Sequence, residues 1–195
     1  EGLGNKFLSH IREVDAIIHL VRCFDSDKIT HVNAKINPVD DLETIKTEII
    51  LSDLEIIQKK LEKGKKKLLQ DKEVKILEEK LNQLNEGKEV VVNNEFEKNF
   101  LSTLGLLSIK PKIIVCNVDE ESLVKGNAFT ESVKKTYSNE KIVSICADIE
   151  DQIMDLNNNE RETFMKEIGL SKTGLNQLIK EGYDLLNLDT FFTSG

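Results

Sequence analysis

The chain has 195 residues, enough for one ordinary domain or for a small domain with an appendage. Hydrophobic residues make up 39% and charged residues 32%, a balance that favours a modest core with a solvated helical extension. The formal net charge of −8 excludes global attraction to nucleic acid, so any such contact needs a local basic patch. The three cysteines, Cys23, Cys116 and Cys146, are too far apart for a metal motif, and we expect buried, reduced thiols.

Three apolar segments without polar alternation predict strands buried on both faces of a parallel sheet, over residues 16–24, 112–117 and 141–147. Between the second and third strands, residues 128–139 predict a helix that Asn127 caps. This order of strand, helix and strand is a βαβ unit. Further helices are expected ahead of the first strand and near 158–168 and 174–187, and residues 190–195 predict the start of another strand.

A long helical pattern separates the first two strands. Its apolar residues recur at alternating steps of three and four, first at Ile50, Leu54, Ile57, Leu61 and Leu68 and then at Val74, Leu77, Leu81 and Leu84. So narrow an apolar stripe favours an antiparallel helical hairpin. Asp40 and Glu43 have the spacing of a capping box at its start, and Gly87 is placed to end its second helix. A shorter helix over 95–107 leads back to the sheet, which predicts an α/β fold with an inserted helical-hairpin arm.

The carboxyl ends of two predicted strands carry residues suited to a purine base, and ligands of open parallel sheets sit beyond such ends. An Asn117 side chain can donate to the ring N7 and accept from an exocyclic amine, while the Val118 carbonyl can accept from the same amine. A main-chain N–H near Ala147, beside Asp148, can reach the ring from the second loop. The alternative interpretation is that Asn117 only caps the following loop and that Asp148 is a solvated acid.

Several separate blocks of the chain resemble one protein family, in the same order. Residues 2–24, "GLGNKFLSHIREVDAIIHLVRCF", resemble the segment after switch II in the Obg-related P-loop NTPases of the TRAFAC class. "ITHVNAKINPVDDLETIKTEI", the helical arm, "CNVDEE" and "TFFTSG" are similar to the YchF/Ola1 subfamily of Obg-like ATPases. The resemblance covers essentially the whole chain, and it implies a partial P-loop NTPase domain that carries the arm.

The resemblance implies a nucleotide site at the strand ends. The Asn-Lys-x-Asp motif of ordinary GTPases becomes Asn-x-x-Glu in this subfamily, here Asn117 to Glu120, and the loop 146–150 takes the place of the second base-contacting loop. The lost Asp would accept from guanine N1 and the 2-amino group, which adenine lacks, so the penalty against adenine disappears. The resemblance implies ATP and Mg²⁺ as cofactors. Some members of the family also hydrolyse GTP.

The chain departs from the family at the phosphate site, because no G-x-x-x-x-G-K-[ST] stretch is present. The phosphate cradle and the Mg²⁺ ligands would therefore lie outside this chain, and we assign no catalytic or metal residue. Beginning at Glu1 without a Met, the chain is expected to be an internal piece that does not hydrolyse ATP alone. We predict four parts. Residues 1–38 are part of the NTPase domain after switch II, and residues 39–107 are the arm. Residues 108–187 are the rest of the NTPase domain with the base loops, and residues 188–195 are the start of a truncated TGS domain.

The predicted tip of the arm is rich in lysine, at Lys59, Lys60, Lys63, Lys65, Lys66 and Lys67. These residues form either a phosphate-contacting patch for RNA, in line with the family's association with ribosomes, or a solvated helix end. A second functional hypothesis is a non-catalytic adaptor that binds ribosome, RNA or protein through the arm.

The longest apolar run, 16–21, is far shorter than the ~20 residues of a membrane span. We therefore expect no membrane partner. The expectation of reduced cysteines favours a cytoplasmic location, and the oligomeric state stays open. Arg12 is expected to pair at the surface with Glu13 or Asp15, and His19 to be a core residue.

Overall fold

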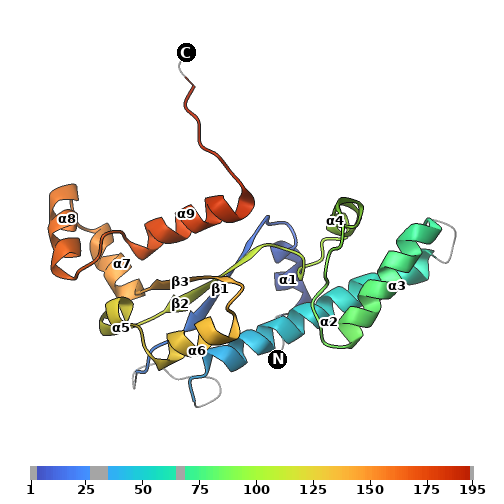
Figure 1. Cartoon of the computed structure of the whole chain (residues 1–195), viewed down its shortest axis with the longest axis horizontal. Helices are drawn as coiled ribbons and strands as arrows, with labels where there is room; N and C mark the ends of the chain where they lie inside the picture. Colours follow the sequence, from blue (N-terminus) through green and yellow to red (C-terminus); the bar gives the residue numbers. More distant parts are fainter. Residues whose placement is uncertain (1–3, 27–34, 65–68, 194–195) are drawn as a thin grey trace. The chain divides into compact units, whose positions relative to one another are not determined.

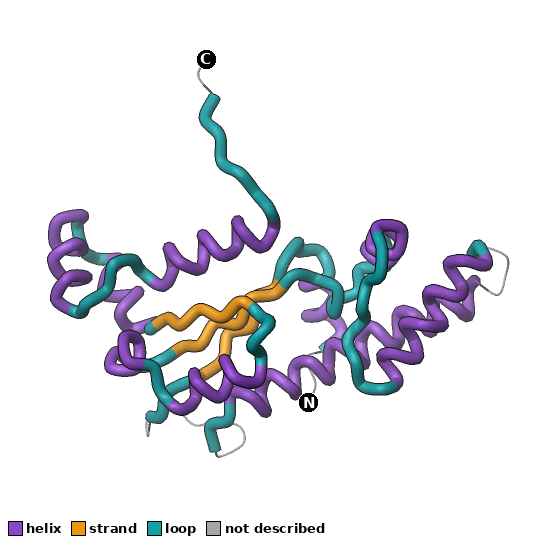
Figure 2. The backbone as a smooth tube through the Cα atoms, viewed as in Figure 1, coloured by secondary structure: helices purple, strands orange, loops and turns teal. Residues whose placement is uncertain are grey.

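The computed structural model describes residues 4–26, 35–64 and 69–193. Its contacts divide the chain into two compact units. The helical unit comprises Glu1–Asp15 and Glu43–Lys110, and the sheet unit comprises Ala16–Leu42 and Pro111–Gly195. Figure 1 labels the elements of both units, and Figure 2 distinguishes their helices, strands and loops. The domain boundaries given above stay predictions.

The sheet unit is built on three parallel strands, which confirms the predicted α/β class. In the described residues β1 (Ile17–Arg22) pairs with β2 (Lys112–Asn117), and β2 pairs with β3 (Lys141–Ile145). The helices of this unit follow in chain order as α5 (Glu120–Lys125), α6 (Ala128–Thr136), α7 (Ala147–Met154), α8 (Asn158–Glu167) and α9 (Gly174–Leu186). The predicted βαβ unit corresponds to β2, α6 and β3, with Asn127 accepting a hydrogen bond from Thr130 as the cap of α6.

Helices pack on both faces of this sheet. One face carries Val21, Ile114 and Cys116, which cluster with Val133 of α6 and Ile149 of α7. All three cysteines are buried and free, as predicted. On the opposite face Ile113, Val115 and Val143 pack against α9. Burial of both faces explains the uninterrupted apolar character of β2.

The prediction that β1 is buried on both faces is wrong for one face. Ile18 and Leu20 are 55% and 60% exposed, whereas His19 and Val21 are buried as predicted for core residues. The physical reason is the position of β1 at the edge of the described sheet, since α9 packs on β2 and β3.

The start of α9 requires glycine. Gly174 is buried, and a Cβ at this position would lie 2.6 Å from Ile145 Cγ2, closer than real Cβ contacts. The Gly174 N–H donates to Glu150 Oε1 at 2.6 Å. This close approach seats the first turn of α9 directly on the end of β3.

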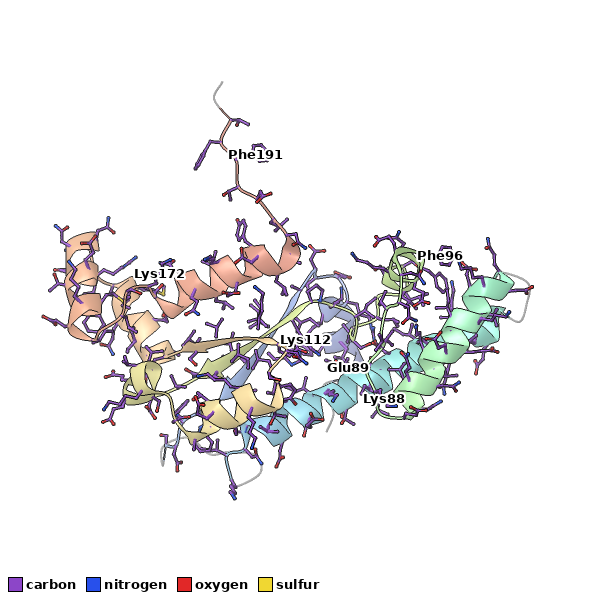
Figure 3. All side chains as sticks on the ribbon, viewed as in Figure 1. Lys88, Glu89, Phe96, Lys112, Lys172 and Phe191 are labelled. Carbon is purple, nitrogen blue, oxygen red and sulfur yellow. The ribbon has the colours of Figure 1, made fainter. Side chains whose placement is uncertain are left out.

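Two local predictions in the sheet unit are wrong. Residues 147–150, expected as part of a loop, form the first turn of α7, because Ile149 and Ile153 present an apolar face to the core. Residues 190–193 are not a strand in the described part of the chain, since no partner strand lies beside them there. Phe191 is 83% exposed in this extended segment (Figure 3).

The helical unit contains the predicted antiparallel hairpin. Its elements are α1 (Asn5–Ile11), α2 (Pro38–Gly64, which starts in the sheet unit), α3 (Asp71–Asn85) and α4 (Glu95–Ser102). Most of the predicted seam of α2 and α3 forms, with Ile50, Ile57, Leu77 and Leu84 buried and Leu54, Leu61 and Leu81 packed beside them. Val74, predicted for the seam, is half-buried and outside this cluster, whereas Ile76 is buried in it. Leu68 lies outside the described residues.

The ends of these helices differ in detail from the prediction. Asp40 does not cap α2, because the helix begins at Pro38 and Asn37 accepts from the Asp40 N–H at 3.4 Å. Proline suits a first helical position, where its missing N–H costs nothing. Gly87, with a φ of 72°, follows α3 as predicted, whereas α4 ends at Ser102, earlier than expected.

The predicted surface ion pair of Arg12 is wrong. Arg12 Nη1 donates to Asp53 Oδ1 at 3.1 Å and to the Gly105 carbonyl at 2.6 Å. Asp53 is fully buried and also accepts the N–H groups of Leu107 and Ser108, at 2.9 and 2.8 Å. A buried carboxylate is costly unless it is paired and hydrogen-bonded. Arg12 therefore pairs with Asp53 and not with the acids next to it in sequence.

A second buried charge, Lys80, holds α3 to α4. Its ammonium is fully buried, 2.7 Å from Glu79 Oε1 and 3.1 Å from Glu97 Oε2. Burial raises the pKa of Glu97, but the N–H and side-chain amide of Asn93 and the Lys80 ammonium outweigh burial and leave the pKa below its ordinary value. The ionised form of Glu97 is therefore the stabilising one.

We expect Glu97→Gln to lower the free energy of unfolding by about 3 kcal/mol at pH 7, because the buried Lys80 side chain loses one of its two carboxylate partners. A carboxyl whose pKa is lowered by folding stabilises above its unfolded value of about 4.3, and this contribution disappears as the pH falls through the lower folded value. Urea denaturation should therefore show a shallower loss of stability toward acid pH for the variant.

The matched control is Glu86→Gln, since the Glu86–Lys88 pair is exposed on both sides and its loss should leave stability unchanged. Equal stabilities of the Glu97 and Glu86 variants at pH 7 would contradict the stabilising role of the Lys80 cluster.

Candidate functional site

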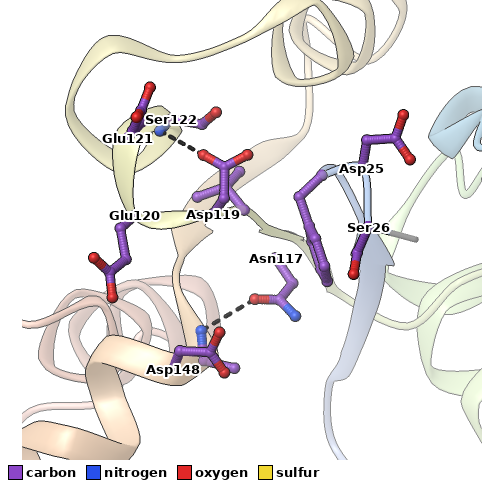
Figure 4. A pocket seen from close by; sticks show the side chains of 11 residues that line it. Asp25, Ser26, Asn117, Asp119, Glu120, Glu121, Ser122 and Asp148 are labelled. Atoms are coloured by element: carbon purple, nitrogen blue, oxygen red, sulfur yellow. Dashed lines mark hydrogen bonds between the residues drawn. The ribbon is translucent and has the colours of Figure 1, made fainter. Parts of the chain in front are cut away.

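The three strand ends meet in one cavity of the sheet unit. Arg22, Asn117 and Ile145 lie in register across β1, β2 and β3, so the segments that follow these strands converge. Together they line an open cavity of about 970 Å³ (Figure 4). Its lining residues are Phe24, Asp25, Ser26, Asn117, Val118, Asp119, Glu120, Glu121, Ser122, Ala147 and Asp148. All five residues assigned from the sequence to base binding lie in this set.

Asn117 ends β2 and connects two walls of the cavity. Its Oδ1 accepts a hydrogen bond from the Ala147 N–H at 3.1 Å (Figure 4). This bond satisfies one of the N–H groups that the first turn of α7 leaves without a helical partner. It also orients the amide, so that Nδ2 is directed away from Ala147. The Ala147 N–H, expected to reach a ligand directly, is instead used to hold Asn117.

The backbone after Asn117 is fixed from both sides. Val118 has a buried side chain, and its N–H donates to the Ile145 carbonyl at 2.8 Å. Asp119 accepts from the Ser122 N–H at 2.8 Å and so caps α5. Capping of the following segment therefore falls to Asp119, not to Asn117. Glu120 Oε1 lies 3.5 Å from Gln152 Nε2 of α7.

The rim of the cavity is acidic. Five carboxylates line it, at Asp25, Asp119, Glu120, Glu121 and Asp148, and within the described residues no Lys or Arg is among the lining set. A site of this charge disfavours phosphate groups and is compatible with a neutral ring. The described residues contain no group of His, Cys, Asp and Glu arranged to hold a metal ion.

The segments that follow β2 and β3 form two walls of the cavity, and residues 24–26, which follow β1, form the third. This third wall was not predicted from the sequence. It follows β1, and β1 is joined to Asn117 because the Cys23 N–H donates to the Asn117 carbonyl at 2.7 Å. Asn127 Nδ2 donates to the Cys23 carbonyl, also at 2.7 Å. The signal was available, since Phe24 follows an apolar strand whose carboxyl end must lie at the same edge of a parallel sheet.

The arm tip is described only in part. Lys59, Lys60 and Lys63 lie on α2, and Lys59 forms an ion pair of 3.1 Å with Glu55. The other lysines of the predicted patch, 65–67, fall outside the described residues. Among the helices that the structure describes, none has the length and apolar character of a membrane span.

Comparison with known proteins identifies relatives over the whole chain, although no family model matches. The chain is 41% identical over 206 residues to "Ribosome-binding ATPase YchF" of Bacillus subtilis and 41% identical over 204 residues to that of Escherichia coli O157:H7. Each alignment covers 100% of this chain and 56% of the relative, so the chain spans about half the length of the curated relatives it matches.

A solved structure, that of the Schizosaccharomyces pombe YchF GTPase, matches with a TM-score of 0.87 and 29% sequence identity, covering 100% of this chain and 56% of that one. The predicted resemblance to YchF proteins is thus supported by sequence and by fold. The chain is similar to YchF proteins over a stretch equal to about half of their length.

Proposed function

We propose that the cavity at the strand ends binds the purine base of a nucleoside triphosphate, ATP first and GTP second, in a hydrolase whose phosphate-binding residues lie outside this chain. The observation that carries the proposal is Asn117, whose amide is oriented by Ala147 at the wall of a cavity that fits a ring. The names of the relatives, ribosome-binding ATPases and a GTPase, support it.

The contacts of a base follow from the chemistry of the walls. Asn117 Nδ2 donates to the purine N7, and the Val118 carbonyl accepts from the 6-amino group of adenine. Phe24 supplies an aromatic ring for stacking. Glu120 replaces the acceptor that ordinary GTPases direct at guanine N1, and Ala147 and Asp148 close the second side.

The acidic rim supports a triphosphate site that lies outside this cavity. Five carboxylates at the cavity disfavour phosphate oxygens, and the described residues offer no metal-binding cluster. We therefore assign only the base to this cavity. When bound, Mg²⁺ would neutralise charge on the transferring phosphoryl group from ligands outside this chain.

We further propose a ribosomal partner for the arm, which implies a cytoplasmic location. The lysines of α2 near its end, with 65–67 beyond the described residues, supply cations for RNA phosphates. The non-catalytic adaptor is the second candidate, because the helical unit forms a compact body of its own. An adaptor would bind the partner equally well with and without nucleotide.

The base-site proposal predicts that Asn117→Ala weakens ATP binding by at least about tenfold, since a directed hydrogen bond to the base and the tether to Ala147 are both lost. Calorimetry on the complete protein with ATP and with GTP measures the effect. Asn139→Ala, an exposed asparagine outside the cavity, is the matched control. Equal ATP affinity in the two variants would refute base binding at Asn117.

The chain by itself is predicted to show no ATP hydrolysis, because its sequence holds no phosphate-binding loop. Release of inorganic phosphate from ATP is measured with the purified chain and with the complete protein side by side. Turnover by the purified chain, lost on Asn117→Ala, would overturn the assignment of the phosphate site to other residues.

The arm proposal predicts that replacing Lys59, Lys60 and Lys63 together with Glu weakens co-sedimentation with ribosomes about tenfold or more at moderate salt. Replacing Lys134 and Lys135 of α6 with Glu adds the same kind of charge in the sheet unit and serves as the control. If the two variants co-sediment alike, the lysines of α2 do not contact the ribosome.

A further inference from the structure

Arg22, the last residue of β1, is built into the wall of the cavity without being one of its lining residues. Its Nε donates to the Phe24 carbonyl at 3.0 Å, and its Nη2 donates to the Ser26 carbonyl at 3.2 Å. The guanidinium carbon also lies 4.9 Å from the centroid of the Phe24 ring. One side chain therefore holds the backbone of residues 24–26 and one face of the aromatic ring.

The geometry requires arginine in particular. Two nitrogens of a planar guanidinium reach two carbonyl groups while the same plane lies over the ring, which a lysine ammonium on a flexible stem cannot do at once. The attraction between a cation and the face of an aromatic ring adds to these bonds and limits rotation of the ring. With one face covered by Arg22, the ring can offer a ligand only its other face.

The position of the ring relative to Asn117 is set by the same strand pairing. Arg22 is in register with Asn117, and the Cys23 N–H donates to the Asn117 carbonyl. Phe24 and Asn117 both line the cavity, and both are held from behind, Phe24 by Arg22 and Asn117 by Ala147. A ligand ring that accepts a hydrogen bond from Asn117 therefore lies in the same cavity as the Phe24 ring.

We propose that Arg22 is a positioning residue that holds Phe24 as the stacking platform for the base, and that this pair favours large purine rings over small pyrimidine rings. The inference rests on the proposed base site and deepens it. Stacking energy grows with the overlap of the two ring systems, and a platform held still loses less entropy on binding than a mobile one.

A double-mutant cycle on the complete protein tests the pair. Affinities for ATP and for CTP are measured for the unchanged protein, Arg22→Lys, Phe24→Ala and the double variant. Phe24→Ala should weaken ATP binding about tenfold. Arg22→Lys should weaken it several-fold while keeping the charge, and the double variant should bind no worse than Phe24→Ala alone. The loss should be larger for ATP than for CTP.

Arg22→Lys also separates positioning from a merely structural role. Loss of support for the end of β1 would lower the melting temperature and weaken ATP and CTP equally, whether or not Phe24 is present. Additive effects of Arg22→Lys and Phe24→Ala, or equal losses for the two nucleotides, would overturn the inference.

The base site itself fails by a different result, namely unchanged ATP affinity in Asn117→Ala. If Asn117→Ala weakens binding while Phe24→Ala and Arg22→Lys do not, the base site stands and the platform is wrong.

Discussion

The in-register parallel pairing of β1, β2 and β3 is the constraint on which the candidate site depends. It places Arg22, Asn117 and Ile145 side by side, so the segments after three strands that are distant in sequence converge at one edge. Hydrogen bonds then join the three walls, from the Cys23 N–H to the Asn117 carbonyl and from the Ala147 N–H to Asn117 Oδ1. A slip of one strand by a single residue would turn its side chains to the other face and separate these groups.

The two units differ in where their charged residues lie. Among the described residues, five carboxylates line the cavity of the sheet unit, a charge that is compatible with a neutral ring and disfavours phosphate groups. In the helical unit, two charges, those of Asp53 and Lys80, are fully buried. Asp53 is held by Arg12 and by the N–H groups of Leu107 and Ser108, and Lys80 is held by Glu79 and Glu97. Asp53 thereby joins α2 to residues 107 and 108, and Lys80 joins α3 to α4.

The elements that could be predicted are those with a local period. The strand 112–117 and the seam through Ile57 and Leu77 carry their pattern in neighbouring residues, and both form as expected. The errors fall where a distant partner decides. Arg12 binds Asp53, 41 residues away, and not the neighbouring Glu13. Residues 147–150 form part of a helix because its apolar face packs into the core. The exposure of Ile18 and Leu20 depends on where α9 packs, which no local pattern in β1 records.

The sequence by itself determined the class of fold, the hairpin arm and the choice of Asn117 as a base-binding candidate. These follow from side-chain periodicity and from the chemical character of single residues, which are properties of short stretches. Only the tertiary structure decided that Ala147 orients Asn117, that Phe24 completes the cavity and that Arg22 holds Phe24 from behind. Those relations join residues that come together only after three strands have paired in one register, so they are properties of the assembled sheet.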